Sequence, residues 1–370
     1  MKVLLVAGAR PNFMKVAPVL FALRRAGHHP VLVHTGQHYD ARMSDTFFRD
    51  LELPDPDFHL GVGSGSHAVQ TARLMEAFEP VLREVRPDWL VVVGDVNSTI
   101  ACALVAVKLK EETGARIAHV EAGLRSGDWR MPEEVNRVLT DRMSDLLLTP
   151  SRDARANLAA EGIPESRVVF VGNVMIDTLL ARLPAARALE FGAGIGVARG
   201  EYALSTLHRP SNVDDPAAFR AVLEALGQVA REMPVVLPLH PRARRQAEAF
   251  GLGALLEPLA VLEPVGYLEM VSLTDGAAAV LTDSGGVQEE TTALGVPCVT
   301  LRESTERPVT VTEGTNRLAP WPLTAGGVLA SFHDALARRS GDPRRPEGWD
   351  GRAGERVVEA LAGASDTGAS

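Results

Sequence analysis

The feature that most constrains the fold is the regular alternation of short apolar runs with segments whose apolar residues recur at helical spacing. Strands of a parallel sheet are buried on both faces and read as continuous apolar runs, and helices connect them. The alternation therefore predicts βαβ units and a parallel, doubly wound sheet. In the first half the expected strands cover residues 3–6, 31–34, 89–93, 116–119, 146–148 and 168–171, and the expected helices cover 14–26, 68–85, 99–110 and 133–143.

A glycine-rich stretch over residues 191–201 precedes a second alternating series. Because 370 residues exceed what one core usually supports, we expect two α/β domains, both Rossmann-like with doubly wound parallel sheets, and an interdomain cleft, as in the glycosyltransferase-B arrangement. The expected domains are 1–172 and 173–350, and residues 351–370 are expected to form a C-terminal helix and a frayed tail that can pack back on the first domain. The second series has expected strands at 202–206, 235–238, 260–262, 277–281 and 298–301, and expected helices at 217–232, 242–250, 267–273, 287–294 and near 354–361.

Charge and hydropathy exclude several classes of protein. The formal net charge of −9 argues against nonspecific binding to nucleic acid or to anionic membranes. No apolar run reaches the length of about 18 residues that a membrane span needs, and the N-terminus reads as a strand rather than a signal peptide, so a cytoplasmic protein is expected. The two cysteines, Cys102 and Cys298, lie in apolar patterns without zinc spacing, so we expect neither a disulfide nor a metal site.

The motif TDSGGVQEE joins an expected strand to an expected helix. Ser284, Gly285 and Gly286 form the turn, where unpaired amides at the helix start can approach an anion without interference from a Cβ atom. The motif therefore predicts a phosphate site, and Glu290, one turn later, is placed to accept hydrogen bonds from sugar or ribose hydroxyls. The structural alternative is a helix N-cap at Asp283 or Ser284 followed by solvated glutamates.

Two cations follow the first expected strand in the motif GARPNFMK. Arg10 lies at the carboxyl end of that strand, and Lys15 lies one turn into the next helix. Open α/β sheets bind ligands at this edge, so the pair predicts capture of a phosphate or pyrophosphate, with Arg10 as a bidentate donor and Lys15 as a point charge. The alternative is a solvated helix start.

Three carboxylates are expected at the same edge of the first sheet. Asp95 follows one buried strand in GDVNST, Glu121 follows the next in HVEAGLR, and Glu133 opens a helix in PEEVNR. Carboxylates clustered beside cations favour split pKa values and proton transfer. Since no metal-ligand spacing accompanies them, general acid–base chemistry is favoured over metal-dependent hydrolysis.

Each of these carboxylates also has a structural interpretation. Asp95 could stabilise the start of a helix that Asn97 or Ser98 caps, and one of the adjacent acids at the start of the PEEVNR helix could serve only the helix dipole. Arg137 lies four positions after Glu133 and could pair with it.

In the second half, histidines follow two successive strands. His208, with an arginine after it, and His240 end equivalent strands, which favours ligand contact over the structural role usual for a lone histidine. The segment EPVGYLEM, residues 263–270, forms a turn into a helix whose main chain could recognise a nucleobase edge. Arg307 follows the strand after the TDSGG helix, so we interpret it as a phosphate contact rather than an exposed helix-start cation.

Taken together, GARPNFMK, TGQH, GDVNST, HVEAGLR, PEEVNR, LHRPSN, HP, TDSGGVQEE and TERP occur in order between residues 8 and 308. In this combination the chain resembles the non-hydrolysing UDP-N-acetylglucosamine 2-epimerase family. The resemblance implies reversible C2 epimerisation of UDP-N-acetylglucosamine to UDP-N-acetylmannosamine, through elimination of UDP to a 2-acetamidoglucal and re-addition, without a cofactor. It also implies a homodimer that supplies a precursor of cell-surface polysaccharide.

The resemblance also implies roles for individual residues. The first domain would supply one wall of the active site, His208 would oppose it from the second domain, and the TDSGG turn would hold the UDP pyrophosphate. Glu290 would bind the ribose, and the main chain near Val265 with the side chain of Met270 would flank uracil. The predicted catalytic residues are Asp95, Glu121, Glu133 and His208, and the predicted substrate-binding residues are Arg10, Lys15, Arg137, His240, Val265, Met270, Ser284, Gly285, Gly286, Glu290 and Arg307, with no metal ligand.

The chain departs from the bacterial type of the family at two motifs. It has GQHYD at 36–40 where that type often shows GQHRE, and TERPV, ending in Val309, where it shows TERPE. The bacterial-type region binds a second, activating UDP-N-acetylglucosamine, so the missing arginine argues against such activation here.

Other functions fit parts of the pattern. A two-domain UDP-sugar glycosyltransferase would share the fold, but Glu121 and Glu133 have no obvious task in it. A hydrolysing 2-epimerase would release free N-acetylmannosamine and UDP. A catalytically silent nucleotide-sugar sensor would bind without turnover, which the intact carboxylate set disfavours.

Overall fold

The computed structural model describes residues 1–37, 47–338 and 345–366. The chain divides into two compact units, one formed by Met1–Ala181 with Glu347–Ser370 and the other by Arg182–Pro346. The first changeover lies inside helix α8 (Val174–Ala188). Each unit contains one parallel sheet and is described by itself.

The sheet of the first unit has seven strands in the order β3-β2-β1-β4-β5-β6-β7, and every neighbouring pair is parallel. The order reverses between β1 and β4, which makes that point the topological switch where ligands of open α/β sheets bind. The central strand β4 is buried along its whole length, as its sequence WLVVV requires. The strands are β1 (Lys2–Ala7), β2 (His29–His34), β3 (Phe58–His59), β4 (Trp89–Val93), β5 (Arg116–Val120), β6 (Leu146–Thr149) and β7 (Val168–Phe170).

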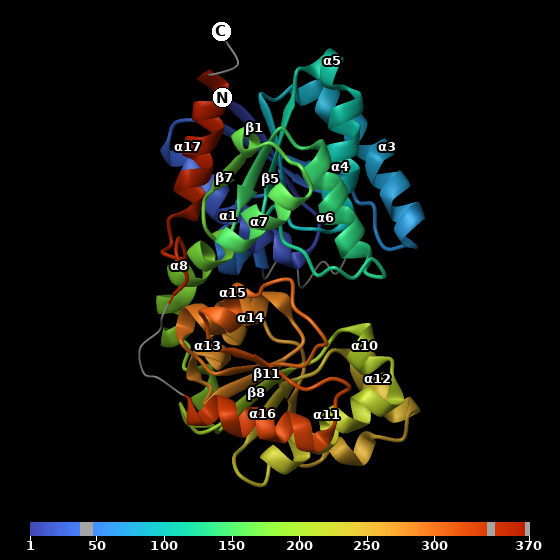
Figure 1. The fold of residues 1–370 in the computed structure, drawn as a ribbon, viewed down its shortest axis with the longest axis vertical. Helices are drawn as coiled ribbons and strands as arrows, with labels where there is room; N and C mark the ends of the chain where they lie inside the picture. The colour runs from blue at the N-terminus through green and yellow to red at the C-terminus, as the bar shows by residue number, and fades with distance from the viewer. Residues whose placement is uncertain (38–46, 339–344, 367–370) are drawn as a thin grey trace. The chain divides into compact units, whose positions relative to one another are not determined.

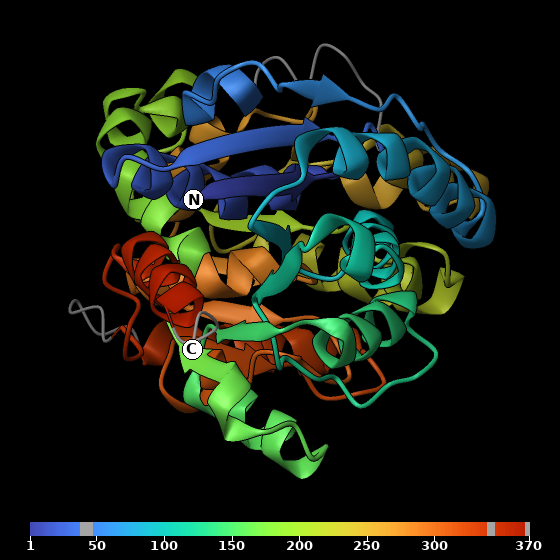
Figure 2. The same cartoon turned by 90° about the horizontal axis from the view of Figure 1, so that it is seen from above.

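Helices cover both faces of this sheet (Figures 1 and 2). One face carries α1 (Arg10–Arg25) and α17 (Ala353–Asp366), and the other carries α3 (His67–Val85), α4 (Asn97–Lys108) and α6 (Pro132–Met143). The second face packs into an apolar core that includes side chains from β1, α3 and α4. The remaining helices are α5 (Lys110–Thr113), α7 (Arg152–Ala160) and a 3₁₀ turn at Glu165–Arg167.

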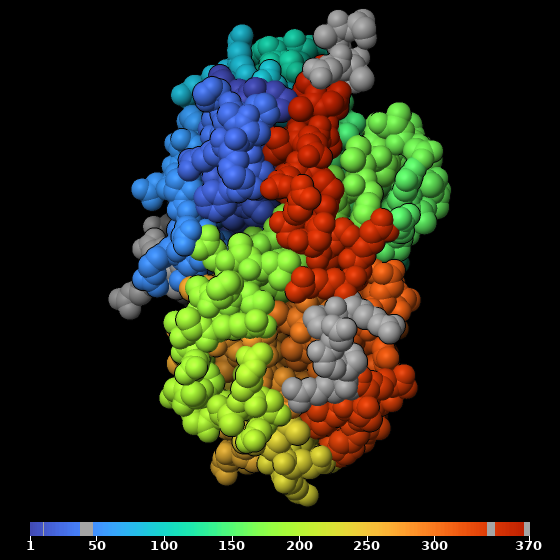
Figure 3. All heavy atoms as spheres, turned by 90° about the vertical axis from the view of Figure 1, so that its left-hand side faces the viewer, coloured from blue at the N-terminus to red at the C-terminus, as the bar shows by residue number. Residues whose placement is uncertain are grey.

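The C-terminal helix α17 packs against α1, near the beginning of the chain (Figure 3). At Gly354 a Cβ atom would lie 2.7 Å from the carbonyl oxygen of Pro18, so only glycine permits this approach. The carboxylate of Asp177 accepts hydrogen bonds from the amides of Ala353, at 3.1 Å, and Gly354, at 2.7 Å. The start of α17 is therefore fixed to α8 as well as to α1.

The sheet of the second unit has six parallel strands in the order β10-β9-β8-β11-β12-β13, with its switch point between β8 and β11. One face packs on α10 (Pro210–Val213), α11 (Pro216–Val229), α12 (Pro241–Ala249) and α16 (Ala325–Ala337), and the other on α9 (Phe191–Gly194), α13 (Tyr267–Gly276) and α14 (Gly285–Leu294). The other elements are β8 (Ala203–Thr206), β9 (Val235–Pro238), β10 (Ala260–Leu262), β11 (Ala279–Thr282), β12 (Cys298–Thr300), β13 (Asn316–Leu318), α15 (Val309–Thr312) and a 3₁₀ turn at Gly253–Leu256.

The prediction of two Rossmann-like parallel-sheet domains is confirmed, with strand and helix positions close to those expected. One local prediction is wrong, because the N-cap of α4 is Val96 rather than Asn97 or Ser98. The side chain of Asn97 donates to Gln70 at 2.8 Å, and that of Ser98 donates to Gln37 at 2.8 Å, so both serve tertiary contacts instead. No helix in residues 1–37, 47–338 or 345–366 is long and apolar enough to cross a membrane.

Candidate active site

The switch point of the first sheet brings together several of the predicted residues. Lys15 lies on α1, Asp95 follows β4 by two residues, and Glu121 directly follows β5. Asn12 joins these segments, because its side-chain oxygen accepts the amides of Gly8 and Ala9 at 3.1 and 3.0 Å while its nitrogen donates to Val93 at 3.1 Å. The turn after β1 is thereby tied to the end of β4.

Lys15 and Glu121 form a buried ion pair at this point. Their side chains are 5% and 6% exposed. Gly94 makes room for the pair, since a Cβ atom there would lie 2.8 Å from the Lys15 ammonium nitrogen, and its φ of +65° suits glycine. Glu121 itself adopts a φ of +71°, which is uncommon for a residue with a side chain. In this conformation its carboxylate contacts the Lys15 ammonium.

Asp95 is held by residues of α6. Its carboxylate contacts the Arg137 guanidinium at 2.5 Å, and its carbonyl oxygen accepts a hydrogen bond from Asn136 at 2.9 Å. On its own helix Arg137 contacts Glu134, at 2.6 Å, so the expected pairing of Arg137 with Glu133 is wrong among the described residues. The i, i+3 geometry brings Glu134 rather than Glu133 to the guanidinium.

The two neighbouring acids of α6 have different environments. Glu134 is buried and accepts hydrogen bonds from the amides of Ser126 and Gly127, at 3.0 and 2.8 Å, so it orders the preceding loop. Glu133 is half-buried and, within the described part of the chain, its side chain has no hydrogen bond or ion pair. Glu134 is therefore the structural acid, and Glu133 is the one available to a ligand.

His119, a buried histidine to which the sequence motifs assign no role, connects two of the segments that carry the carboxylates. His119 is fully buried in β5; its Nε2 lies 2.7 Å from the carbonyl oxygen of Gly94 and its Nδ1 lies 2.6 Å from Asp141. Burial alone would raise the pKa of the Asp141 carboxyl, but His119 and Arg125 outweigh it and lower that pKa. The ring of His119 is therefore held between the Asp141 carboxylate and the main chain of Gly94.

The switch point of the second sheet gathers His208, Asp283 and the start of α14. Asp283 follows β11, is fully buried and lies 2.8 Å from Nδ1 of His208, whose own side chain is 56% exposed. The N-cap of α14 is Ser284, and its side chain makes no capping hydrogen bond. The helix therefore begins at Gly285 with its first amides available in the way that anion binding requires.

Arg307 lies against this helix start. A Cβ atom at Gly285 would be 2.6 Å from a terminal nitrogen of the Arg307 guanidinium. The expected alternative for Arg307, an exposed cation, is wrong, because the side chain is 8% exposed and contacts Glu289 at 2.9 Å and also Glu306. Glu306 also pairs with Arg302, at 2.7 Å.

Buried charges surround this helix start. Three guanidinium groups, from Arg209, Arg302 and Arg307, lie next to the Glu306 carboxylate, and Arg307 also contacts Glu289. Burial would raise the pKa of Glu306, yet the three arginines hold it well below its usual range, so the carboxylate stays ionised. Arginines beside a helix N-terminus are suited to an anionic ligand.

Glu290 is buried one turn into α14, next to Tyr267 of α13. Burial, together with the nearby charge of Glu289, raises the pKa of Glu290 to about 8, although a hydrogen bond from Tyr267 opposes the shift. At neutral pH this carboxyl therefore keeps a proton, so it can donate one hydrogen bond to a hydroxyl group as well as accept one.

We expect the protonation of Glu290 to make the free energy of unfolding depend on pH. The pKa of Glu290 is higher in the folded than in the unfolded chain, so between these two values the folded state binds the additional proton. The stabilisation that is present below about pH 4.5 is therefore lost as pH rises to about 8. The free energy of unfolding of wild type relative to Glu290→Gln should therefore fall across this window, by at most about 1.4 kcal/mol per pH unit. Urea unfolding at several pH values measures the difference, with the exposed Glu248→Gln as control; parallel curves for wild type and Glu290→Gln would contradict it.

Three other predicted substrate contacts lie in the second unit, and two of them, His240 and Met270, have structural roles. His240 is the N-cap of α12, and its Nδ1 accepts the amide of Arg242 at 3.2 Å. Val265 is half-buried in the turn before α13, and Met270 packs partly against the apolar cluster that contains Leu204. Arg10 begins α1, but its side chain lies outside the described structure, as do residues 38–40 of the GQHYD motif.

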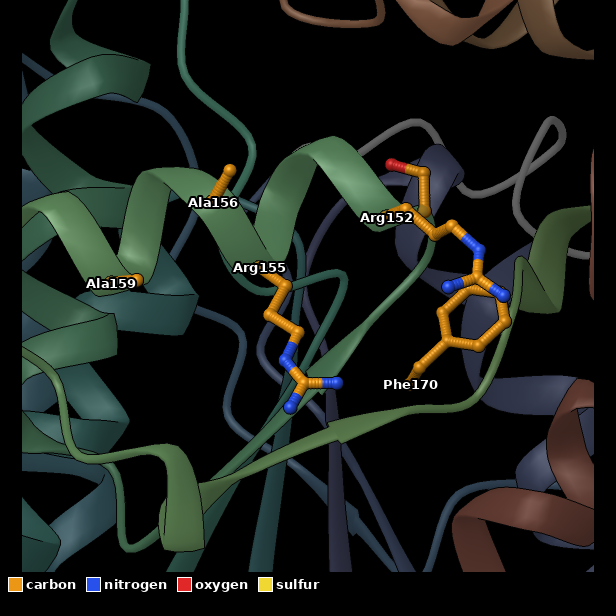
Figure 4. A pocket seen from close by; sticks show the side chains of 6 residues that line it. Arg152, Arg155, Ala156, Ala159 and Phe170 are labelled. Carbon is orange, nitrogen blue, oxygen red and sulfur yellow. The ribbon is translucent and has the colours of Figure 1, made fainter.

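A surface hollow of about 510 Å³ lies elsewhere in the first unit, between α7 and β7 (Figure 4). Arg152 and Arg155 line it, and they pair with Glu347 and Glu165. The strands β5 and β6 separate β7 from β4, so this hollow lies away from the carboxylates of the switch point.

Comparison with known proteins places the chain among relatives of similar length. It matches the family described as UDP-N-acetylglucosamine 2-epimerase over residues 22–362. The UDP-N-acetylglucosamine 2-epimerase of Methanocaldococcus jannaschii is 40% identical, over 98% of this chain and 99% of the relative. The UDP-2,3-diacetamido-2,3-dideoxy-D-glucuronate 2-epimerase of Pseudomonas aeruginosa is 42% identical over the same shares, 98% and 99%.

The fold agrees with these matches. The crystal structure of the Methanocaldococcus jannaschii UDP-GlcNAc 2-epimerase in complex with UDP-GlcNAc and UDP superposes with a TM-score of 0.88 at 39% identity, over 98% of this chain and 99% of that one. Sequence and fold thus correspond along almost the whole chain, including both switch points. The chain belongs to the UDP-N-acetylglucosamine 2-epimerase family.

Proposed function

We propose that the protein catalyses reversible C2 epimerisation of UDP-N-acetylglucosamine to UDP-N-acetylmannosamine. The observation that carries the proposal is the set of carboxylates at the first switch point. Glu121 is held by Lys15, Asp95 by Arg137, and Glu133 lies one helical turn before Arg137. A family relative that is 39% identical was crystallised with UDP-GlcNAc and UDP, which supports the same substrate here.

Several acids and cations are needed because the C2 proton is not adjacent to a carbonyl group. We propose that UDP leaves C1 as a carboxylate removes the C2 proton, which gives a 2-acetamidoglucal, and that UDP returns as a proton is delivered to the opposite face. Such a path requires a base, an acid and cations that stabilise the departing diphosphate. We assign the proton transfers to Asp95, Glu121 and Glu133 without ranking them.

The second unit would bind the nucleotide. Ser284, Gly285 and Gly286 would hold the pyrophosphate at the start of α14, where the arginine cluster adds positive charge. Glu290 would bind the ribose, and Val265 and Met270 would flank uracil. The remaining proposed contacts are Arg10, His208 and Arg307 to the leaving group, and Lys15, Arg137 and His240 elsewhere on the substrate.

One reaction tests this proposal. Incubation of the purified protein with UDP-N-acetylglucosamine in heavy water should yield UDP-N-acetylmannosamine, with deuterium incorporated at C2 of both sugar nucleotides, and NMR follows both changes. Release of free N-acetylmannosamine would indicate the hydrolysing reaction instead, and transfer of the sugar to an acceptor would indicate a glycosyltransferase. Binding of UDP-N-acetylglucosamine without any turnover would contradict catalysis and indicate a nucleotide-sugar sensor.

A second substrate is supported by one observation. The relative named as a UDP-2,3-diacetamido-2,3-dideoxy-D-glucuronate 2-epimerase is 42% identical, which lies between the 40% of a relative named as a UDP-N-acetylglucosamine 2-epimerase and the 44% of one named as a homolog of that enzyme. The same experiment with the diacetamido uronate decides between them through the ratio of kcat/KM values. A higher value for the uronate would replace the proposed hexose while leaving the C2 chemistry unchanged.

We also propose that the chain forms a homodimer that supplies a precursor of cell-surface polysaccharide. The exposed side chains of Trp129 and Leu139, 64% and 45% accessible, support association because large apolar groups at a surface favour contact with another chain. Light scattering should give twice the 39.6 kDa mass of one chain; a single-chain mass at micromolar concentration would exclude the dimer.

A further inference from the structure

His208 and Asp283 form a close pair at the second switch point. The Nδ1 atom of His208 lies 2.8 Å from Oδ1 of Asp283, which is fully buried. The backbone amide of His208 donates to the same carboxylate at 3.1 Å, so main chain and ring are both tied to it. The histidine ring therefore has one nitrogen committed to Asp283 and presents Nε2 as the nitrogen that can meet a ligand.

We propose that Asp283 is a positioning residue of the epimerisation: its carboxylate keeps the proton of His208 on Nδ1, so that Nε2 is the atom that contacts the departing diphosphate. The inference rests on the proposed function, in which His208 serves the leaving group. An imidazole whose Nδ1 is a permanent donor can gain or lose a proton at Nε2 without turning its ring. As an imidazolium it offers a charged N–H to the diphosphate.

The surroundings of Asp283 keep its carboxylate ionised. Burial on its own would raise the pKa of the Asp283 carboxyl, but hydrogen bonds from His208 and from the amide of Arg209 lower it. Oδ2 accepts from the amides of His208 and Arg209, at 3.1 and 3.0 Å, and from the Asn212 side chain at 3.2 Å. A carboxylate with this many donors can only accept a hydrogen bond from His208.

Replacement by asparagine should reverse the tautomer. The Arg209 amide and the Asn212 side chain donate to Oδ2 only, while the His208 amide is shared between Oδ1 and Oδ2, at 3.2 and 3.1 Å. The amide oxygen of an Asp283→Asn variant would therefore take the Oδ2 position and its NH₂ group the position of Oδ1. The NH₂ group donates, so Nδ1 of His208 becomes an acceptor and the ring proton moves to Nε2. Protonation of Nδ1 would then place two donors against each other, which suppresses the imidazolium.

Two measurements on the purified full chain test this. We expect ¹⁵N NMR of histidine-labelled wild type to show His208, assigned through a His208→Gln variant, with its proton on Nδ1, and Asp283→Asn to show it on Nε2. We expect Asp283→Asn to lower kcat by about 10²–10⁴-fold and to weaken UDP binding by a smaller factor, because the N–H on Nε2 still meets the diphosphate but without the charge. The control Asp275→Asn removes another buried carboxylate of the same unit, paired with Arg187 and Arg199, and should keep the wild-type kcat.

The outcomes separate the inference from the proposed function. A proton on Nε2 in wild type, or an unchanged kcat in folded Asp283→Asn, would overturn the role of Asp283. If Asp283→Asn fails to fold, the wild-type tautomer alone decides. If wild type does not epimerise the substrates but His208 carries its proton on Nδ1, the proposed function is wrong while the His208–Asp283 pairing is confirmed. The role of Asp283 in epimerisation is then overturned together with the proposed function.

Discussion

Replacing Glu121 by Gln is expected to abolish deuterium incorporation at C2 and to lower kcat by about 10²–10⁴-fold. Gln keeps the shape of the side chain but cannot take up a proton. The change also leaves the Lys15 ammonium, 5% exposed, without its counter-ion. Removal of one partner of a buried ion pair costs about 3–5 kcal/mol, so the free energy of unfolding should fall as well.

Exchange in heavy water and urea unfolding measure these two effects separately. Glu161→Gln is a suitable control, because Glu161 pairs with Arg125 on the same unit but is 34% exposed, and it should keep wild-type exchange. Glu133→Gln should also lose C2 exchange. Normal exchange in both Glu121→Gln and Glu133→Gln would remove these carboxylates from the proton transfers.

Replacing Gly285 by Ala is expected to weaken UDP binding by about 10–100-fold. The added Cβ atom would lie 2.6 Å from the Arg307 guanidinium and 3.0 Å from the Glu306 carboxylate. Arg307 is held between two buried carboxylates, so it cannot move aside without breaking an ion pair. A lost hydrogen bond to a charged group is worth about 1.5–3 kcal/mol, which corresponds to the expected change in Kd.

Isothermal titration with UDP measures the effect. Gly326→Ala is a suitable control, because Gly326 also lies in the first turn of a helix, α16, and a Cβ atom there would meet nothing within 4 Å. We expect wild-type affinity for this control. If Gly285→Ala also binds UDP as wild type does, the start of α14 is not the diphosphate site.

Much of this site could be predicted because parallel strands end at one edge of a sheet. Asp95, Glu121 and His208 each follow an apolar run, and the fold places each of them just past its strand. The positions of the switch points could not be predicted from the sequence, because the pairing of β4 with β1 depends on contacts between distant segments. Strand β13 was not predicted, because it has only three residues, Asn316–Leu318, and little periodicity.

The partners of buried charges were the hardest to predict. Glu133 and Glu134 look equivalent in sequence, and only helix rotation decides that Glu134 meets Arg137. The structural alternative for the TDSGG turn was an N-cap at Asp283 or Ser284; Ser284 takes the N-cap position, whereas Asp283 binds His208 and Arg209. A polar residue such as His119 inside an otherwise apolar strand is the signal that could have revealed the Asp141 pair, because a buried polar group requires a partner.

The return of α17 to the first unit has a consequence for how the chain is made. The first unit leaves off at Ala181 and resumes at Glu347, whereas the second is one continuous segment. During translation α1 therefore cannot pack against α17 until the whole second unit has been synthesised. At about 5–20 residues per second, this delay is on the order of ten seconds or more. The second unit can fold during translation, while the first is completed only after it.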